Sequence, residues 1–261
     1  MQQVGPRVRP TIRRMPVYRF ERLDALRGVA IVWMTLYHFT FDLNHFGYWQ
    51  QDFYRNPVWT GQRTAIVSLF LFCAGLGQAV AVYQQQTTVR FWRRWAQVAV
   101  CALLVTAGSY QMYPQSYIYF GVLHGIAVML VIVRYTTGWG RYLWLAGAIV
   151  FAIKLGAASA HSAWAGAAFF DEPALGWLGL GSRKPVTEDY VPLFPWLGVM
   201  WWAMAAGQWM LQKRLHWLVR PIPVAGAPLG WLGRWSLSWY MLHQPVLIGL
   251  FAALAFVTRK A

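Results

Sequence analysis

Charged residues are scarce in this chain of 261 residues, and acidic residues are the scarcest. Charged residues make up 12% of the sequence, against about 25% in an average soluble domain. Asp and Glu together number 8, whereas Lys and Arg number 23. Hydrophobic residues make up 58% of the chain. This composition excludes an ordinary soluble globular domain and favours a polytopic membrane protein.

Several familiar motifs are also missing. Cys73 and Cys101 are the two cysteines, and both lie in apolar runs, so we expect small core residues and no disulfide. The sequence has no Gly-x-x-x-x-Gly-Lys-Ser/Thr and no Gly-x-Ser-x-Gly motif, which argues against a nucleotide-driven pump and a standard serine hydrolase. It also has no His-x-x-x-His pair and no cysteine cluster, so we expect no metal site.

The apolar runs predict an all-α transmembrane bundle of about seven to eight spans. Seven helices are expected, at about 24–42, 63–84, 95–112, 117–134, 142–160, 192–211 and 231–256. Pro245 should kink the last of them. Residues 161–190 are expected to form a long outer loop with an interfacial helix, or alternatively an eighth span at 161–180.

The positive charges fall in alternate loops. Residues 1–22 form a basic arm, and further Arg and Lys residues occur at 90–94, 134–141 and 213–220. This pattern predicts that the amino terminus and these loops are cytoplasmic. Anionic membrane lipid is therefore the expected partner of the net charge of +15, and nucleic acid is not.

The first predicted helix carries three ionisable residues on one face. With 3.6 residues per turn, Arg27 and His38 lie about 20° apart around the axis, and Asp42 lies roughly 40° further round. Ionisable residues in a membrane helix usually face a bundle interior or a water-filled cavity. The stripe therefore indicates a functional site.

Two interpretations of this stripe remain open. His38 can act as a general base oriented by Asp42, or it can be a buried histidine bonded to a neighbouring helix. Arg27, with Arg22 beside it, can bind a phosphate group, or its side chain can extend to the lipid headgroups. His124 and His243 lie in other predicted helices, at unrelated spacing. For each of them we favour a packing and hydrogen-bonding role over a role as a ligand.

Four stretches together resemble a known family. They are 22–28 (RLDALRG), 119–124 (YFGVLH), 189–198 (DYVPLFPWLG) and 232–245 (LGRWSLSWYMLHQP). They are similar to bacterial membrane proteins related to the catalytic domain of heparan-α-glucosaminide N-acetyltransferase. The likeness covers about residues 20–256 and implies transfer of an acyl group from acyl-CoA, across the membrane, to a sugar.

A second likeness is to the membrane acyltransferases that O-acetylate bacterial surface polysaccharides. Their first helix carries an arginine or lysine, ten residues and then a histidine, a pattern that falls here on Arg27 and His38. This chain departs from the pattern of the first family at one position. Asn56 stands where the active histidine of that family, in the loop after the first helix, is expected. An asparagine cannot serve as a base; His45 is then the alternative to His38 within that loop.

The sequence thus predicts a basic arm at 1–22 and an acyltransferase-like membrane domain at 23–257. The resemblance implies that acyl-CoA, with acetyl-CoA as the simplest donor, binds near Arg27 and Arg22. The acceptor is expected to be a glycan or small molecule, and His38 with Asp42 would carry the catalysis. The expected pocket residues are Tyr119, His124, Trp196, Tyr240 and His243.

Two other functions stay open, a proton-coupled transporter and a non-catalytic membrane assembly protein. The expected location is the bacterial cytoplasmic membrane. The sequence leaves the oligomeric state open, with a homodimer as one option.

Overall fold

The computed structural model describes residues 19–258, and most of these residues are helical. The one pairing of extended backbone among them is an isolated parallel bridge between Phe120 and Tyr190. The predicted all-α class is therefore confirmed. Most of the basic arm predicted at 1–22 lies outside the described residues.

Nine α-helices and four short 3₁₀ helices follow one another along the described residues. The α-helices are α1 (Glu21–His45), α2 (Pro57–Tyr83), α3 (Thr88–Met112), α4 (Val122–Tyr135), α5 (Tyr142–Ala163), α6 (Leu193–Lys213), α7 (Leu215–Val219), α8 (Ala227–Arg234) and α9 (Ser236–Thr258). The 3₁₀ helices are η1 (Thr137–Trp139), η2 (Ala165–Asp171), η3 (Pro173–Leu178) and η4 (Val224–Gly226).

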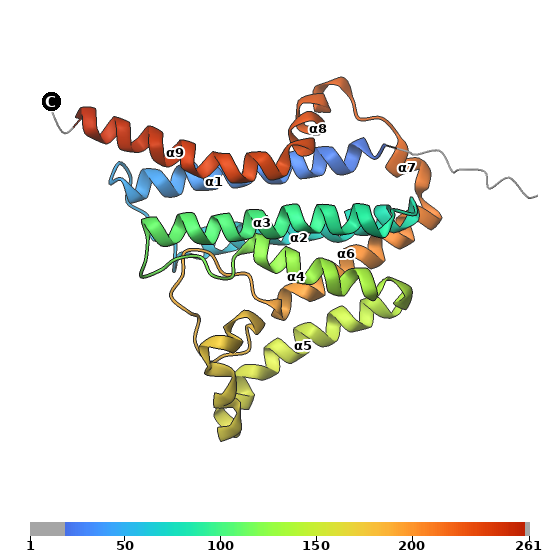
Figure 1. Ribbon diagram of the computed structural model, residues 1–261, viewed down its shortest axis with the longest axis horizontal. Helices are drawn as coiled ribbons and strands as arrows, with labels where there is room; N and C mark the ends of the chain where they lie inside the picture. The colour runs from blue at the N-terminus through green and yellow to red at the C-terminus, as the bar shows by residue number, and fades with distance from the viewer. Residues whose placement is uncertain (1–18, 259–261) are drawn as a thin grey trace, which may run out of the picture.

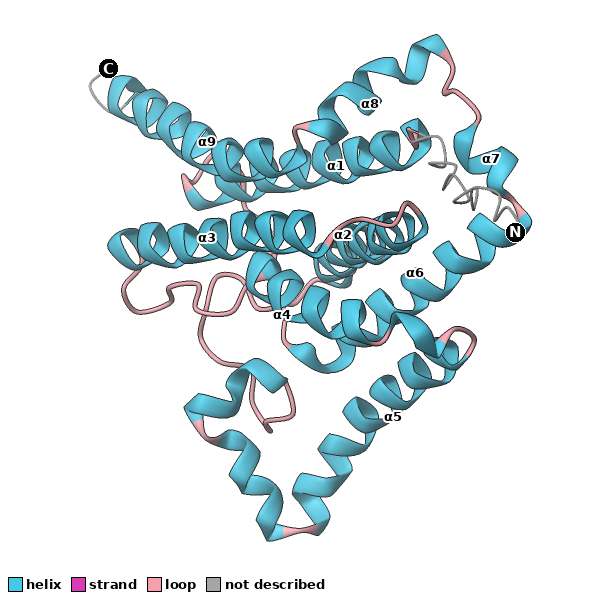
Figure 2. Cartoon of the chain, turned by 45° about the vertical axis from the view of Figure 1, so that its right-hand side comes forward, coloured by secondary structure: helices cyan, strands magenta, loops and turns pink. Residues whose placement is uncertain are grey.

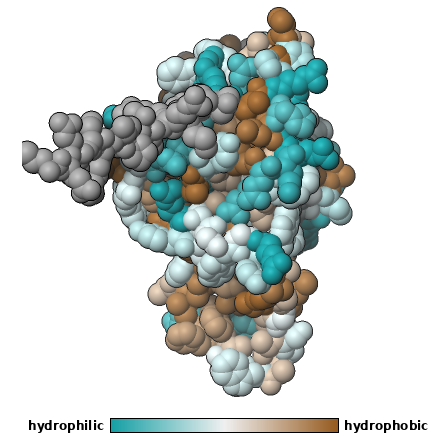
Figure 3. Space-filling view, turned by 90° about the vertical axis from the view of Figure 1, so that its right-hand side faces the viewer, coloured by the Kyte–Doolittle hydropathy of each residue, from teal (hydrophilic) through white to brown (hydrophobic). Residues whose placement is uncertain are grey.

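The long helices α1 to α6 alternate in direction between two ends of the molecule (Figure 1). We call one the basic end, because most of the described arginines lie there, at the starts of α1 and α3 and around the segments that follow α4 and α6. Figure 3 looks onto this end and shows hydrophilic side chains gathered over much of it. The opposite end, which we call the loop end, holds residues 46–56, 113–121 and 164–192.

Three helices combine the length and the apolar composition needed to cross a membrane. Within residues 19–258 they are α2, α5 and α9, and α4 is a shorter apolar helix. Many large apolar side chains on α3, α5 and α9 face outward, which is typical of helices that contact lipid. The chain is a membrane protein.

The segment 161–180 does not form the eighth span that we considered. Its residues fold into the end of α5 followed by η2 and η3. These 3₁₀ helices have 7 and 6 residues, whereas about 20 apolar residues are needed to cross a bilayer as a helix. This part turns back at the far end of α5 and lies beside its lower half (Figure 2).

The second, third and fourth helices begin at other residues than the sequence predicted. The second helix starts at Pro57 rather than 63, since the Asn56 side chain accepts a hydrogen bond from the Val58 N–H and the proline occupies the first turn. The third starts at Thr88 rather than 95, because the Thr87 side chain caps it by accepting a hydrogen bond from the Arg90 N–H. The fourth starts at Val122 rather than 117. There the backbone of Phe120 pairs with residues 190–191 instead of continuing a helix.

The last predicted helix, 231–256, is two helices in the structure. Trp235 leaves helical geometry between α8 and α9, so α8 crosses α1 near the basic end while α9 runs beside the outer half of α1 (Figures 1 and 2). Pro245, where we predicted a kink, lies inside α9, which continues to Thr258.

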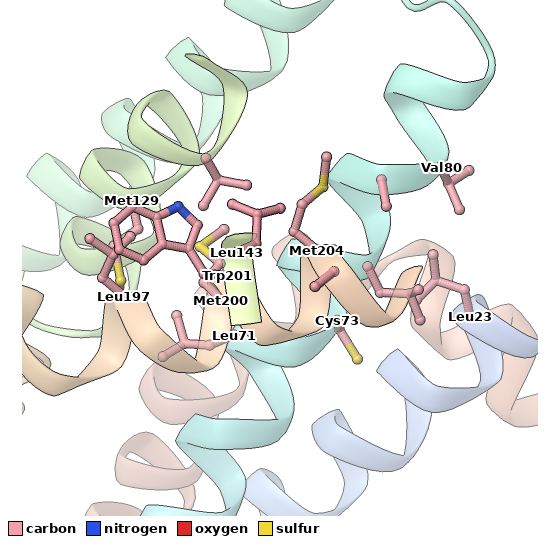
Figure 4. Packing of buried hydrophobic residues seen from close by; sticks show 14 of the residues in the cluster. Leu23, Leu71, Cys73, Val80, Met129, Leu143, Leu197, Met200, Trp201 and Met204 are labelled. Carbon is pink, nitrogen blue, oxygen red and sulfur yellow. The ribbon is translucent and has the colours of Figure 1, made fainter. Parts of the chain in front are cut away.

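The main apolar core lies between α2, α4 and α6 (Figure 4). Leu71, Met129, Met200 and Met204 are completely buried there. Small residues let the helices approach closely, because a Cβ atom at Gly75 would overlap the Met200 carbonyl oxygen. Helix α2 packs closely on α6, α1 packs on α2, and α9 packs on α1.

A second close contact holds α8 against α1. A Cβ atom at Gly233 would overlap the backbone carbonyl of Asp24, and one at Gly28 would overlap the carbonyl of Leu229. Both overlaps are with backbone atoms, which cannot rotate away. The contact therefore fixes where α9 begins relative to α1.

We predict that Gly233→Ala destabilises the protein, by about 1–3 kcal/mol for an overpacked contact. Gly249→Ala is the matched control, because a Cβ atom there has open space around it and alanine favours the helix. Thermal unfolding in detergent should show a lower midpoint for the first variant only. Equal midpoints for the two variants would contradict the close contact.

Candidate active site

His38 of α1 and His243 of α9 form a direct pair. The His38 Nδ1 and His243 Nε2 atoms are 2.7 Å apart, and the ring centroids are 4.9 Å apart with planes 22° from parallel. His243 is buried and His38 is half-buried. The neighbouring-helix partner that we considered for His38 is thus a second histidine.

The backbone around His243 determines which nitrogen carries hydrogen in the neutral pair. The His243 Nδ1 atom lies 2.8 Å from the Tyr240 carbonyl oxygen and 3.2 Å from that of Trp239. Carbonyl oxygens only accept, so Nδ1 carries the hydrogen and Nε2 of His243 is an acceptor. His38 must then donate from Nδ1, which leaves the lone pair of His38 on its Nε2 atom. That atom is the one available to remove a proton.

Asp42 does not orient His38 as we expected. Its Oδ1 atom accepts a 2.9 Å hydrogen bond from the Gln244 side chain, and the residue is only 2% exposed. The spacing correctly puts Asp42 and His38 on one face, but α9 packs across that face. His38 therefore bonds to His243 and Asp42 bonds to Gln244, both across the interface between α1 and α9.

These contacts belong to a polar seam between α1 and α9. Trp239 Nε1 donates to Thr35 Oγ1 over 2.9 Å, and Thr35 in turn donates to the Ile31 carbonyl. The seam comprises the pairs Thr35–Trp239, His38–His243 and Asp42–Gln244. In a bundle surrounded by lipid, interhelical hydrogen bonds of this kind hold helices together.

Aromatic rings surround the histidine pair on the side of α2. Tyr37 contacts the His38 ring edge-on at 5.9 Å, and Tyr240 contacts His243 at 5.8 Å. Tyr37 also packs on Phe53 of the 46–56 loop. Of the predicted pocket residues, Tyr240 and His243 therefore lie beside His38.

The other predicted pocket residues lie elsewhere. His124 Nδ1 accepts from the Gly121 N–H, and its Nε2 lies 3.0 Å from Thr106 Oγ1. Thr106 donates its own hydrogen to the Ile118 carbonyl, so it accepts from His124, and both nitrogens of that ring are satisfied. Tyr119 has the rings of Tyr117 and Tyr190 as neighbours.

Trp196 is the last of the predicted pocket residues. It packs against the main core at the start of α6. Its structural role there is to fill the space between α6 and its neighbours.

A cavity of about 580 Å³ opens at the basic end between α1, α2 and α3. Five arginines and one acidic residue line it, namely Arg19, Arg27, Arg90, Arg93, Arg94 and Asp24. Asp24 is bound by Arg27 at 3.1 Å and by Arg19 at 3.7 Å. Within residues 19–258, Arg90, Arg93 and Arg94 have no acidic partner. The cavity therefore has a surplus of positive charge, suited to a multivalent anion.

Arg27 lies at the inner limit of this cavity. Its guanidinium rests against Gly77 of α2, where any side chain would collide with it. His38 follows eleven residues later on the same helix face, about 16 Å further along the axis. Arg22, also expected here, does not line the cavity. It stacks on the Trp217 ring at 4.5 Å and donates to the Arg220 carbonyl.

The loop end carries acidic, basic and tyrosine side chains together. Burial, followed by the charges of Glu188 and Asp42, raises the pKa of Tyr113. Burial, followed by the charge of Arg63, lowers the pKa of Lys184. His45, the alternative base, packs edge-on against Tyr113 with centroids 6.2 Å apart. His45 and Tyr113 are thus electrostatic neighbours of Asp42 toward the loop end.

Asn56, which replaces the expected loop histidine, has a structural role as the cap of α2. No group of three or more His, Cys, Asp or Glu residues suited to a metal lies together within the described part of the chain.

Sequence reasoning did not identify Gln244 or the arginines at 90–94, in the first turns of α3, as site residues. A signal for Gln244 was present, because His243 and Gln244 are polar residues inside an otherwise apolar stretch of helix, and polar residues in a membrane helix usually face other helices.

Comparison with known families identifies the class of protein. The model of the family described as heparan-alpha-glucosaminide N-acetyltransferase, catalytic, matches residues 19–245. The chain therefore belongs to this family of membrane acetyltransferase catalytic domains, as the four sequence stretches predicted. No curated protein and no solved structure matched the chain.

We predict distinct tautomers for the three membrane histidines in their neutral forms. His38 and His243 should carry hydrogen on Nδ1, and His124 on Nε2, because of the partners described above. Nitrogen NMR of histidine-labelled protein separates protonated from unprotonated ring nitrogens. Single His→Gln variants assign the signals. An Nε2-protonated His38 would contradict the proposed lone-pair position.

Proposed function

We propose that this protein transfers an acyl group, acetyl in the simplest case, from acyl-CoA to a hydroxyl or amine of a sugar-type acceptor. His38 acts as the general base, and His243 is the residue that positions it. The 2.7 Å contact between the two histidines carries this proposal, because it leaves the Nε2 lone pair of His38 free. Membership of an acetyltransferase family supports it independently.

The reaction needs one proton to move twice. His38 Nε2 removes the proton of the acceptor O–H or N–H as the acceptor atom attacks the thioester carbonyl carbon. The carbon–sulfur bond then breaks, and the CoA sulfur takes the proton from His38. His243 accepts the Nδ1–H of His38 throughout, which holds the imidazole in one orientation.

The basic cavity is the proposed site for CoA. Arginines bind phosphate oxygens through two parallel hydrogen bonds, and five arginines line this cavity. The acyl arm of the donor would extend along α1 from Arg27 toward His38. The acceptor would enter from the loop end, so the two substrates approach the histidine pair from opposite sides.

We further propose that the basic end faces the cytoplasm of a bacterial cell. Cytoplasmic loops of membrane proteins carry an excess of Lys and Arg, and the cavity would then meet the cellular pool of acyl-CoA. The protein would reside in the cytoplasmic membrane with its amino terminus inside. Family membership favours this enzyme over the transporter and the assembly protein considered earlier.

We predict that His38→Ala lowers kcat by about 10²–10⁴-fold, the usual contribution of a general base, with a small effect on the KM for acetyl-CoA. The measurement is acetyl transfer by protein reconstituted in lipid. His161→Ala is the control, because His161 lies in α5 at the loop end and bonds to the Ala157 carbonyl. Unchanged turnover in His38→Ala would exclude the proposed base.

His243 should act through position rather than contact with substrate. His243→Gln keeps an acceptor for the His38 Nδ1–H, whereas His243→Leu removes it. We therefore expect kcat to fall further in the leucine variant, with the glutamine variant partly rescued and the KM values similar. Equal losses in both variants would indicate that His243 only fills space.

The cavity makes a separate prediction for the donor. Arg94→Ala should weaken acetyl-CoA binding, seen as an increase of tenfold or more in KM, and the increase should shrink at high salt. Arg141→Ala is the control, because Arg141 lies at the basic end but does not line the cavity. Equal effects of the two variants would show that net charge, rather than this cavity, attracts CoA.

A further inference from the structure

Two buried oxygen atoms next to the histidine pair have no hydrogen-bond donor among the described residues. They are Asp42 Oδ2 and Gln244 Oε1. Each belongs to a side chain whose other polar atom is used, because Gln244 Nε2 donates to Asp42 Oδ1 over 2.9 Å. Since one hydrogen bond joins the two groups, the two unused oxygens lie in the same small region between α1 and α9.

An unused acceptor in this place is costly. Leaving a buried polar group without a partner costs about 1–3 kcal/mol, and more for a charged group. Asp42 is 2% exposed, and its electrostatic neighbours are His45 and Tyr113. No Lys or Arg forms an ion pair with it within the described range 19–258. Such a group in a native protein needs an explanation, and a ligand is one.

The position of these oxygens relates them to the proposed reaction. Asp42 lies one helical turn, roughly 6 Å, beyond His38 in the direction of the loop end. Gln244 directly follows His243, the partner of His38. The two oxygens therefore lie on the loop-end side of the histidine pair, the side from which we propose that the acceptor arrives.

We propose that Asp42 Oδ2 and Gln244 Oε1 bind the acceptor, each accepting a hydrogen bond from an N–H or O–H group next to the one that reacts at His38. This inference rests on the proposed function and names the residues that determine its acceptor specificity. Both atoms only accept, so they select acceptors with neighbouring donor groups, such as an amino alcohol or a sugar. An acceptor with a single polar group would leave at least one oxygen without a partner.

The Asp42→Asn variant separates this role from a structural one. An asparagine keeps the oxygen that accepts from Gln244 Nε2 and replaces Oδ2 with an amide that donates instead of accepting. The variant also removes a buried carboxylate charge that has no ion-pair partner among the described residues, so we expect thermal stability to be unchanged or higher. In the same variant the acceptor loses the Oδ2 atom that would bind it. Asp52→Asn is the matched control, because Asp52 lies in the loop after α1 and its side chain accepts from the backbone N–H groups of Tyr54 and Arg55.

The experiment compares three amines as acceptors with labelled acetyl-CoA and the full-length protein in lipid nanodiscs. Glucosamine and trans-2-aminocyclohexanol carry a hydroxyl beside the amine, and cyclohexylamine does not. For the wild type we expect the first two to have KM values at least tenfold lower than that of cyclohexylamine. In Asp42→Asn this preference should disappear, with the KM for acetyl-CoA unchanged, while Asp52→Asn should keep it.

The outcomes distinguish this inference from the proposed function. Wild-type transfer in which Asp42→Asn keeps the preference overturns the inference and leaves the acyltransferase standing. If no amine is acetylated, the proposed function fails for these acceptors, and direct binding of labelled glucosamine tests the two oxygens by itself. Equal binding to wild type and Asp42→Asn would then overturn the inference. A stability loss in Asp42→Asn would show that the pair is not arranged as described.

Discussion

The hydrogen-bonded seam between α1 and α9 is the interaction on which the site depends. Thr35, His38 and Asp42 point to one side of α1, and each bonds to a residue of α9. None of these contacts exists within either helix alone. The orientation of the His38 ring therefore follows from the position of α9, which the close contact of Gly233 with α1 fixes in turn. The small residues at the helix crossing fix the position of α9, and the polar contacts between α1 and α9 then orient the His38 ring.

The two ends of the molecule divide the proposed reaction. Positive charge without acidic partners gathers in the cavity at the basic end, whereas most acidic residues lie toward the loop end. Arg27 and His38 mark two levels of one helix, about 16 Å apart along its axis. In the proposed reaction the anionic donor approaches along the first half of α1, and the hydrogen-bonding acceptor approaches along the second half. Helix α1 thus carries a residue for each substrate.

Helical periodicity places His38 and Asp42 on one face of α1, and both residues bond to α9. Periodicity could not predict these partners, since they lie more than 200 residues away in the sequence, on a helix whose packing depends on the whole bundle. The same limit explains the misplaced start of α4. The backbone of Phe120 pairs with a distant loop, a tertiary contact that no local pattern encodes. His124 is a similar case. The sequence shows an isolated histidine, and the hydrogen-bond partner of its Nε2 atom is Thr106 of another helix.

Transfer across the bilayer is the central claim, and sidedness of the substrates tests it most directly. The protein would be reconstituted in sealed vesicles with the basic end outward, with glucosamine trapped inside and labelled acetyl-CoA added outside. The account predicts labelled product in the vesicle interior, and little product when the positions of donor and acceptor are exchanged. Product formed only when both substrates share the compartment at the basic end would contradict the account.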